Sequence, residues 1–270
     1  MRNITTLVLL AFSLLTFSSA FAADDDFPGR KKYPKVPYIE LEDFHNKFND
    51  SIVVDVRSIL EFETLRIKGS LNIPVAADSF ESEVAKVRKD SNKPIIFYCN
   101  GHTCMKSYIA TKKARDANIG DVFAFDAGIF DWTKAHPDKA VLLGDSPVDL
   151  AKLIPKSNFK KRLLKPDAFS DQATLPGKKT LVLDVRDKFQ RAGIGFYPGK
   201  ERWASLDEKQ KLRKYIQKAK EQNRTLLIYD EVGKQVQWLQ YELEKAGLKD
   251  YYFMAHGARG YYQELATWSK

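Results

Sequence analysis

The chain carries the same sequence pattern twice, 129 residues apart, and this repeat limits the folds that it can adopt. VVDVRSILEF at 53–62 recurs as VLDVRDKFQR at 182–191. Downstream, ANIGDVFAFDAGIFDW at 117–132 recurs as AGLKDYYFMAHGARGYY at 246–262, again with an offset of 129 residues. A constant offset at both ends of a long segment predicts two copies of one domain.

Short apolar runs in each copy predict strands. In the first copy they are 52–56, 95–98 and 122–125. Continuous apolar runs of this length are typical of strands that are buried on both faces of a parallel sheet. Helical spacing follows the second run in each copy, and Asn118 and Gly247 stand where a left-handed helix C-cap is expected. The predicted fold class is α/β, with two tandem domains that each hold a mainly parallel sheet flanked by helices.

The expected domain boundaries follow from the two copies. The first domain is predicted at 23–141 and the second at 167–270. The segment 142–166 shows no matching strand pattern and is interpreted as the connection between the two domains.

The first 22 residues have the pattern of a secretory signal peptide. Arg2 precedes an apolar stretch, and a small-x-small motif ends at Ala22. The apolar stretch is shorter than the roughly 20 residues that a membrane-spanning helix needs. We therefore expect a chain without a membrane anchor that is exported, either periplasmic or secreted.

The basic residues indicate no nucleic-acid partner. Lys and Arg number 44 against 35 Asp and Glu, which gives a formal net charge of +9. The cations are dispersed and form no basic patch interleaved with aromatic residues, as nucleic-acid binding would favour. A dispersed positive charge favours solubility and weak attraction of anions.

Both cysteines lie in one short segment, FYCNGHTCMKS at 97–107, and three interpretations are open. A structural bridge between Cys99 and Cys104 would close a loop too small to stabilise the fold much. A metal site needs a second pair of ligands, yet His102 is the one histidine nearby, so we expect no metal. The third interpretation is a thiolate nucleophile with a neighbouring thiol.

The position of Cys99 favours the nucleophile. It ends a predicted buried strand, and a helical pattern begins about seven residues later. Ligands of open α/β sheets bind at the carboxyl ends of the strands, and the N–H groups and dipole of a helix N-terminus favour an anion. We therefore expect a lowered pKa for the Cys99 thiol, which would make it the reactive thiolate.

The residues after Cys99 are expected to form a loop that binds the substrate. Lys106 and His102 would add positive charge, and Gly101 would allow a tight turn. Ser107 would brace the loop or cap the helix. The predicted loop residues are Asn100, Gly101, His102, Thr103, Met105, Lys106 and Ser107.

The combined pattern resembles the rhodanese family in its tandem, two-domain form. The resemblance rests on VVDVRSILEFETLRIKGSLNIP at 53–74, on the strand that ends in cysteine and on FDAGIFDW at 125–132. It implies that Cys99 takes a sulfane sulfur from a small anionic donor such as thiosulfate and becomes a persulfide. A thiol or another thiophilic acceptor then removes the sulfur, and no cofactor is implied.

Two departures from the family pattern keep other functions open. The loop is two residues longer than usual, which suggests a wider cradle, and Arg66 replaces the usual histidine of the first half. Rhodanese-like phosphatases and arsenate reductases also have enlarged loops, but they carry His before the cysteine and Arg at the loop end. This chain has Tyr98 and Lys106 there, and a bidentate clamp on an oxyanion needs Arg. A non-enzymatic sulfur carrier or anion-binding module is the third alternative.

Four further residues carry specific expectations. Asp55 and Arg57 are expected to be a structural ion pair near the site. Asp230 takes the place of Cys99 in the second copy and cannot form a persulfide, so that domain is predicted to be inactive and to wall the first domain's cleft. Cys104 either fills the longer loop or resolves the persulfide, expelling hydrosulfide and leaving a disulfide.

Overall fold

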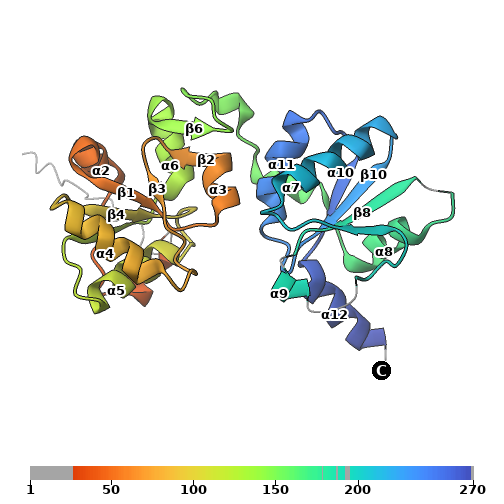
Figure 1. Cartoon of the computed structure of the whole chain (residues 1–270), viewed down its shortest axis with the longest axis horizontal. Coiled ribbons are helices and arrows are strands. Elements are labelled where there is room, and N and C mark those ends of the chain that lie inside the picture. Colours follow the sequence, from red (N-terminus) through yellow and green to blue (C-terminus); the bar gives the residue numbers. More distant parts are fainter. Residues whose placement is uncertain (1–26, 178, 187, 192–194, 269–270) are drawn as a thin grey trace, which may run out of the picture.

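The computed structural model describes residues 27–177, 179–186, 188–191 and 195–268, and the predicted signal peptide lies outside them. Figure 1 shows two bodies, each built around a sheet with helices against it, which confirms the predicted α/β class. No helix in this part of the chain is both long and apolar enough to cross a bilayer.

The first sheet is parallel and contains the three strands that the sequence predicts. Its order is β3-β1-β4-β5. A single parallel bridge between Tyr38 and Ala124 extends it beyond β5. The strands are β1 (Ile52–Asp55), β3 (Leu71–Asn72), β4 (Ile95–Tyr98) and β5 (Val122–Phe125).

The second sheet repeats this topology. Its order is β7-β11-β10-β8-β9, with every pairing parallel. Asp184 pairs with Tyr229 as Asp55 pairs with Tyr98 in the first sheet. The strands are β7 (Leu163–Leu164), β8 (Thr180–Asp184), β9 (Glu201–Trp203), β10 (Thr225–Tyr229) and β11 (Tyr251–Met254).

The connection is shorter than the sequence predicts. Leu163 and Leu164, inside the expected connection 142–166, form β7 and pair with β11. At its other end, Leu142 belongs to β6 (Ala140–Leu142), which pairs antiparallel with β2 (Leu65–Ile67) of the first domain. A two-residue edge strand is too short to show a periodicity in the sequence, and β7 was therefore not predicted.

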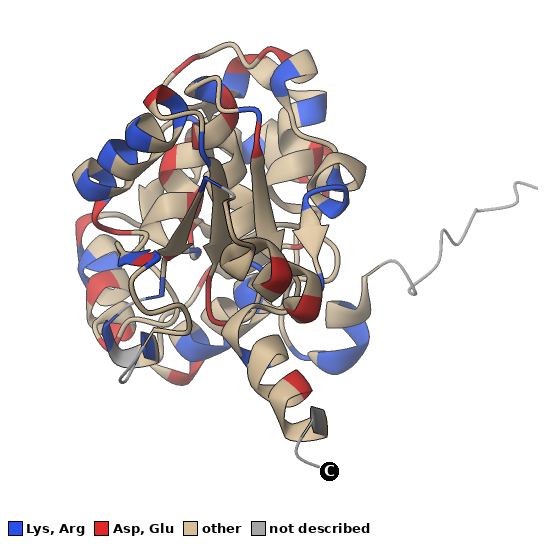
Figure 2. Cartoon of the chain, turned by 90° about the vertical axis from the view of Figure 1, so that its right-hand side faces the viewer, with Lys and Arg blue, Asp and Glu red and all other residues tan. Residues whose placement is uncertain are grey.

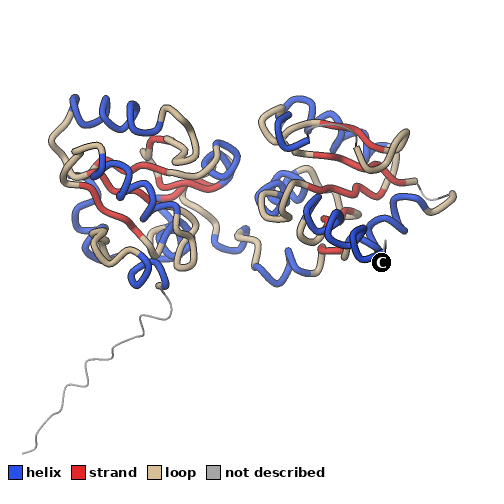
Figure 3. The backbone as a smooth tube through the Cα atoms, turned by 90° about the horizontal axis from the view of Figure 1, so that it is seen from below, coloured by secondary structure: helices blue, strands red, loops and turns tan. Residues whose placement is uncertain are grey.

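Helices cover both faces of each sheet (Figure 3). In the first domain they are α1 (Pro28–Lys32), α2 (Leu41–Lys47), α3 (Ile59–Thr64), α4 (Phe80–Asp90), α5 (Lys106–Asp116) and α6 (Gly128–Ala135). In the connection and second domain they are α7 (Lys156–Lys160), α8 (Pro166–Thr174), α9 (Lys188–Arg191), α10 (Lys209–Glu221), α11 (Val236–Lys245) and α12 (Gly257–Trp268). Short 3₁₀ turns are η1 (Phe48–Asp50), η2 (Pro137–Lys139) and η3 (Leu150–Lys152).

Local sequence explains where the helices of the two copies begin and end. α5 is followed by Asn118 and α11 by Gly247, with φ of 60° and 71°, the left-handed conformation expected at both C-caps. Charged residues lie mainly on the helices and loops around the sheets, with Lys and Arg interspersed among Asp and Glu (Figure 2).

The two domains meet through α3 and α11. Phe130 of α6 stacks on Trp238 of α11, with ring centroids 5.5 Å apart. Glu63 of α3 forms an ion pair with Lys209 of α10. Because α3 directly follows the carboxyl end of β1, the second domain packs against the edge of the first sheet where its strands end.

Candidate active site

The cysteine loop is held tightly at the carboxyl edge of the first sheet. Cys99 follows β4 directly, and residues 100–105 lead into α5. Gly101 and Gly128 have φ of 132° and 69°, and a Cβ on Gly128 would lie 2.4 Å from the Gly101 nitrogen. The first turn of α6 therefore presses against the loop so closely that only glycine fits there.

The Cys99 thiol is fully buried and acts as a hydrogen-bond donor. Its exposed fraction is 0%, and its Sγ donates to the Cys104 carbonyl oxygen at 3.3 Å and to the Ser107 hydroxyl at 3.6 Å. Burial, followed by the hydrogen bond to the Cys104 side chain, raises the pKa of the Cys99 thiol well above its usual value. The expectation of a lowered pKa was wrong, because burial outweighs the help that Ser107 gives to the thiolate.

Cys104 is the more acidic thiol of the pair. It is partly exposed, and both cysteines are free thiols. A hydrogen bond from the Cys99 side chain is the largest influence, and with the backbone N–H groups of Lys106 and Asn100 it lowers the pKa of Cys104 to about 6 despite partial burial. The loop therefore stabilises a thiolate, but on the second cysteine.

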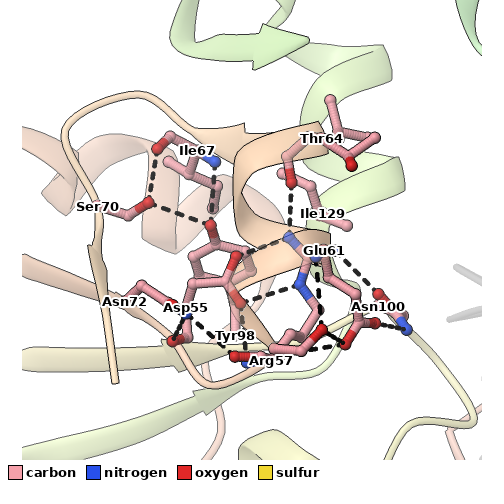
Figure 4. Close-up of polar contacts among 12 residues, drawn as sticks. Asp55, Arg57, Glu61, Thr64, Ile67, Ser70, Asn72, Tyr98, Asn100 and Ile129 are labelled. Atoms are coloured by element: carbon pink, nitrogen blue, oxygen red, sulfur yellow. Dashed lines mark hydrogen bonds and ion pairs between the residues drawn. The ribbon is translucent and has the colours of Figure 1, made fainter. Parts of the chain in front are cut away.

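A buried ion pair between Asp55 and Arg57 holds the cysteine loop in place. The expected pair between Asp55 and Arg57 is present, with Nη2 of Arg57 2.6 Å from Oδ2 of Asp55 and both side chains 0% exposed. The same guanidinium donates from Nη1 to Oδ1 of Asn100 at 3.0 Å and from Nη2 to the Leu65 carbonyl at 2.6 Å (Figure 4). Arg57 thus connects Asn100, the residue next to Cys99, to the first domain.

Glu61 holds the same loop from the other side. It forms a capping box with Ser58 at the start of α3. Its Oε1 accepts a hydrogen bond from Asn100 Nδ2 at 3.0 Å (Figure 4). Its Oε2 accepts one from Lys106 Nζ at 3.4 Å. Burial opposes its ionisation, but Arg57 and Lys106 keep the pKa of Glu61 below its usual value. The S-x-x-E motif at 58–61 is visible in the sequence and is typical of a capping box. This motif does not predict that Glu61 also contacts the cysteine loop.

The remaining predicted loop residues are placed differently. His102 forms a hydrogen bond with Asp131 of α6, with 2.6 Å between Nε2 and Oδ2, and its ring stacks on Phe27 at 4.3 Å. Thr103 is exposed, and Met105 is half-buried just before α5. The loop therefore gathers Asn100, Cys104, Lys106 and Ser107 around Cys99, while His102 is bound to α6.

Trp238, a residue of the second domain, contacts Arg57, which holds the cysteine loop through Asn100. The Arg57 guanidinium lies 5.0 Å from the centre of the Trp238 ring, and Trp238 is 1% exposed. Its Nε1 is buried without a hydrogen-bond partner among the described residues. No motif or periodicity predicted this contact between the second domain and the residue that holds Asn100.

In the second domain, the loop that follows β10 corresponds to the cysteine loop. Its backbone N–H groups bind the carboxylate of Asp230, which belongs to the same loop. Asp230 is 1% exposed, and its two oxygens accept hydrogen bonds from backbone N–H groups of the loop. Burial raises the pKa of Asp230, and those N–H groups oppose the shift. The donors belong to Val232 at 3.0 Å, Gly233, Gln235 at 2.6 Å and Val236 at 3.2 Å.

Comparison with known proteins assigns the first domain. Residues 40–135 match the family model of the rhodanese-like domain. A curated HTH-type transcriptional regulator of Mycobacterium tuberculosis is 34% identical over 83 residues, which cover 31% of this chain and 34% of the regulator. The chain therefore spans about a third of the length of this relative.

Solved structures show a distant likeness. A thiosulfate sulfurtransferase of Pseudomonas aeruginosa is 18% identical, covering 84% of this chain and 44% of its own, with a TM-score of 0.37. A human single-domain sulfurtransferase is 22% identical, covering 37% of this chain and 96% of its own, with a TM-score of 0.31. At these TM-scores the likeness carries no argument about activity.

Proposed function

Because residues 40–135 form a rhodanese-like domain, we propose that this protein is a sulfurtransferase. It moves a sulfane sulfur from a small anionic donor such as thiosulfate, through a persulfide on Cys99, to a thiol or another thiophilic acceptor. The observation that carries the proposal is the cysteine pair at the carboxyl end of a central parallel strand, in a loop anchored by Arg57 and Glu61.

The electrostatics of the loop support an anionic donor. The loop leads into the N-terminus of α5, an 11-residue helix whose dipole favours negative charge. Lys106 is 43% exposed and adds an ammonium group at the same end of the helix. These groups stabilise both an incoming thiosulfate and the persulfide anion that it leaves behind.

The chemistry is a double displacement. A loop thiolate attacks the outer sulfur of thiosulfate, the sulfur–sulfur bond breaks, and sulfite leaves with the bonding electron pair. The transferred sulfur is then carried on Cys99 as a persulfide. The acceptor then attacks the terminal sulfur of the Cys99 persulfide, and the Cys99 thiolate is released.

Phosphatase or arsenate reductase chemistry is less well supported. Such chemistry needs a planar, bidentate donor at the end of the loop. The residue there is Lys106, a point charge whose ammonium contacts Glu61. A sulfur carrier without turnover is the remaining alternative, and it differs in having no steady-state activity.

The second domain is proposed to be catalytically inactive. Asp230 occupies the position of Cys99 and takes up four N–H groups that would otherwise face an anion. Its contribution is the surface that packs on α3 and places Trp238 against Arg57.

Intact mass before and after exposure to thiosulfate tests the proposal. We expect a gain of one sulfur atom that a thiol reductant removes, together with steady release of sulfite when cyanide is the acceptor. A mass gain without turnover would identify a carrier. Hydrolysis of an aryl phosphate or reduction of arsenate, with no mass gain, would contradict sulfur transfer.

A further inference from the structure

The two thiols of the loop differ in access and in hydrogen bonding. Cys99 is 0% exposed, so a donor in solution does not touch its sulfur in this arrangement. Cys104 is partly exposed and packs against the same apolar cluster as Cys99. A donor that enters the loop therefore meets Cys104 first.

The hydrogen bonds place the proton on Cys99 and the negative charge on Cys104. The Cys99 sulfur lies 3.3 Å from the Cys104 carbonyl oxygen and 3.6 Å from the Ser107 hydroxyl, so its single S–H has an acceptor within the buried loop. The Cys99 side chain also lowers the pKa of the Cys104 thiol. The Cys104 sulfur is approached by the backbone N–H groups of Asn100 and Lys106 and by the charge of Lys106. A thiolate is far more nucleophilic than a thiol, so the attacking group of the pair is Cys104.

We propose that Cys104 is the first sulfur acceptor and that it loads Cys99, which lies buried behind it. This proposal rests on the proposed sulfurtransferase activity and adds a second catalytic residue to it. It assigns a role to the cysteine that the longer loop contains, other than filling space or resolving a persulfide.

The two steps balance without an added oxidant or reductant. The Cys104 thiolate attacks the outer sulfur of thiosulfate, and sulfite departs with the electron pair of the broken sulfur–sulfur bond. Cys99 then attacks the terminal sulfur of the Cys104 persulfide while the Cys104 sulfur leaves and takes up the proton of Cys99. The sulfur now lies on Cys99, and Cys104 returns its proton to solvent.

Single-cysteine variants distinguish this route. Cys99→Ser and Cys104→Ser are pulsed with thiosulfate, alkylated and mapped by peptide mass, so that each variant reports one sulfur. We expect Cys99→Ser to take up one sulfur and to retain it on Cys104, because serine cannot accept it in the second step. Cys104→Ser should load Cys99 at least about tenfold more slowly, because a buried neutral thiol is then the nucleophile.

The pH profile of loading gives a second readout. In wild type, the loading rate should rise with a pKa of about 6, the value of the Cys104 thiol. In Cys104→Ser the profile should move to higher pH, because burial raises the pKa of the Cys99 thiol. Rapid alkylation of the unloaded wild type should modify Cys104 before Cys99, and this measurement does not depend on whether a variant folds.

Several outcomes overturn the proposal. Loading of Cys104→Ser at the wild-type rate, with none in Cys99→Ser, would leave sulfur transfer intact but remove Cys104 from it. A disulfide in the wild type, with a longer-lived Cys99 persulfide in Cys104→Ser, would make Cys104 a resolving thiol instead. If the wild type itself takes up no sulfur, the proposed function fails together with this inference.

Discussion

The two loops that follow the central strands β4 and β10 share one backbone plan. The Cys99 carbonyl accepts the Ile129 N–H at 3.0 Å, and the Asp230 carbonyl accepts the Ala258 N–H at 2.8 Å. Gly128 and Gly257 follow the next strand in each domain, with φ of 69° and 59°.

The loops differ in what fills them. Asp230 draws four N–H groups onto its own carboxylate, so the position that would hold an external anion is already occupied. In the first domain the loop has one residue more, 100–105 against 231–235, and α5 has 11 residues against 10 in α11. The longer loop contains a second thiol. The same backbone arrangement therefore holds a pair of thiols in the first domain and a hydrogen-bonded carboxylate in the second.

The largest expected effect is that of removing the thiol at the end of β4. Cys99→Ala should reduce thiosulfate:cyanide turnover to background while the protein keeps its fold, because the acceptor takes the sulfur from the Cys99 persulfide, even though Cys104 can still receive sulfur from the donor. Turnover assays and far-ultraviolet circular dichroism would measure this. Residual activity above a few per cent of wild type would show that another residue carries the transferred sulfur.

Removing the Asp230 carboxylate from the loop of the second domain should lower the stability of the protein rather than its activity. Asp230→Ala leaves four backbone donors without their acceptor, and an unsatisfied buried donor costs about 1–3 kcal/mol. We expect a loss of unfolding free energy of at least that size, measured by denaturant titration. Added sulfate should restore part of the lost unfolding free energy in Asp230→Ala. It should have a smaller effect on the unfolding free energy of Asp230→Asn. If Asp230→Ala is as stable as wild type, the carboxylate does not hold this loop together.

The contact between the domains should couple the second domain to the first site. Trp238→Ala removes a buried ring beneath Arg57, and such truncations cost about 3–5 kcal/mol. We expect a destabilised protein with lower turnover, because Arg57 then holds Asn100 less firmly. Trp238→Phe is the matched control: it keeps a ring and should retain most of the activity. Equal turnover in all three proteins, under conditions where all are folded, would restrict the second domain to packing.

The smallest effect is expected at Glu61. Glu61→Gln keeps the capping box with Ser58 but removes the charge that faces Arg57 and Lys106. Since the folded-state pKa of Glu61 is depressed, its contribution to stability is present above the unfolded value near 4.5 and is lost as the pH falls through the folded value. The unfolding free energy of wild type should therefore fall more steeply on acidification than that of Glu61→Gln. Parallel curves would contradict the charge interaction.

The sequence by itself determined the repeat, the central strands of each sheet and the cysteine at a strand end. These are local properties: apolar runs of four residues such as Ile95–Tyr98 are visible in one stretch of chain, and a constant offset needs no coordinates. The ion pair of Asp55 and Arg57 was also within reach, since the two residues are two positions apart.

Tertiary structure alone decided which thiol has the lower pKa and which residues hold the loop. Burial sums over neighbours from distant segments, so the pKa of Cys99 is raised even though its place before a helix predicted the reverse. Trp238 meets Arg57 from another domain, and β7 exists only because β11 offers an edge to pair with. Such effects depend on distances between residues far apart in the chain, which no periodicity or motif encodes.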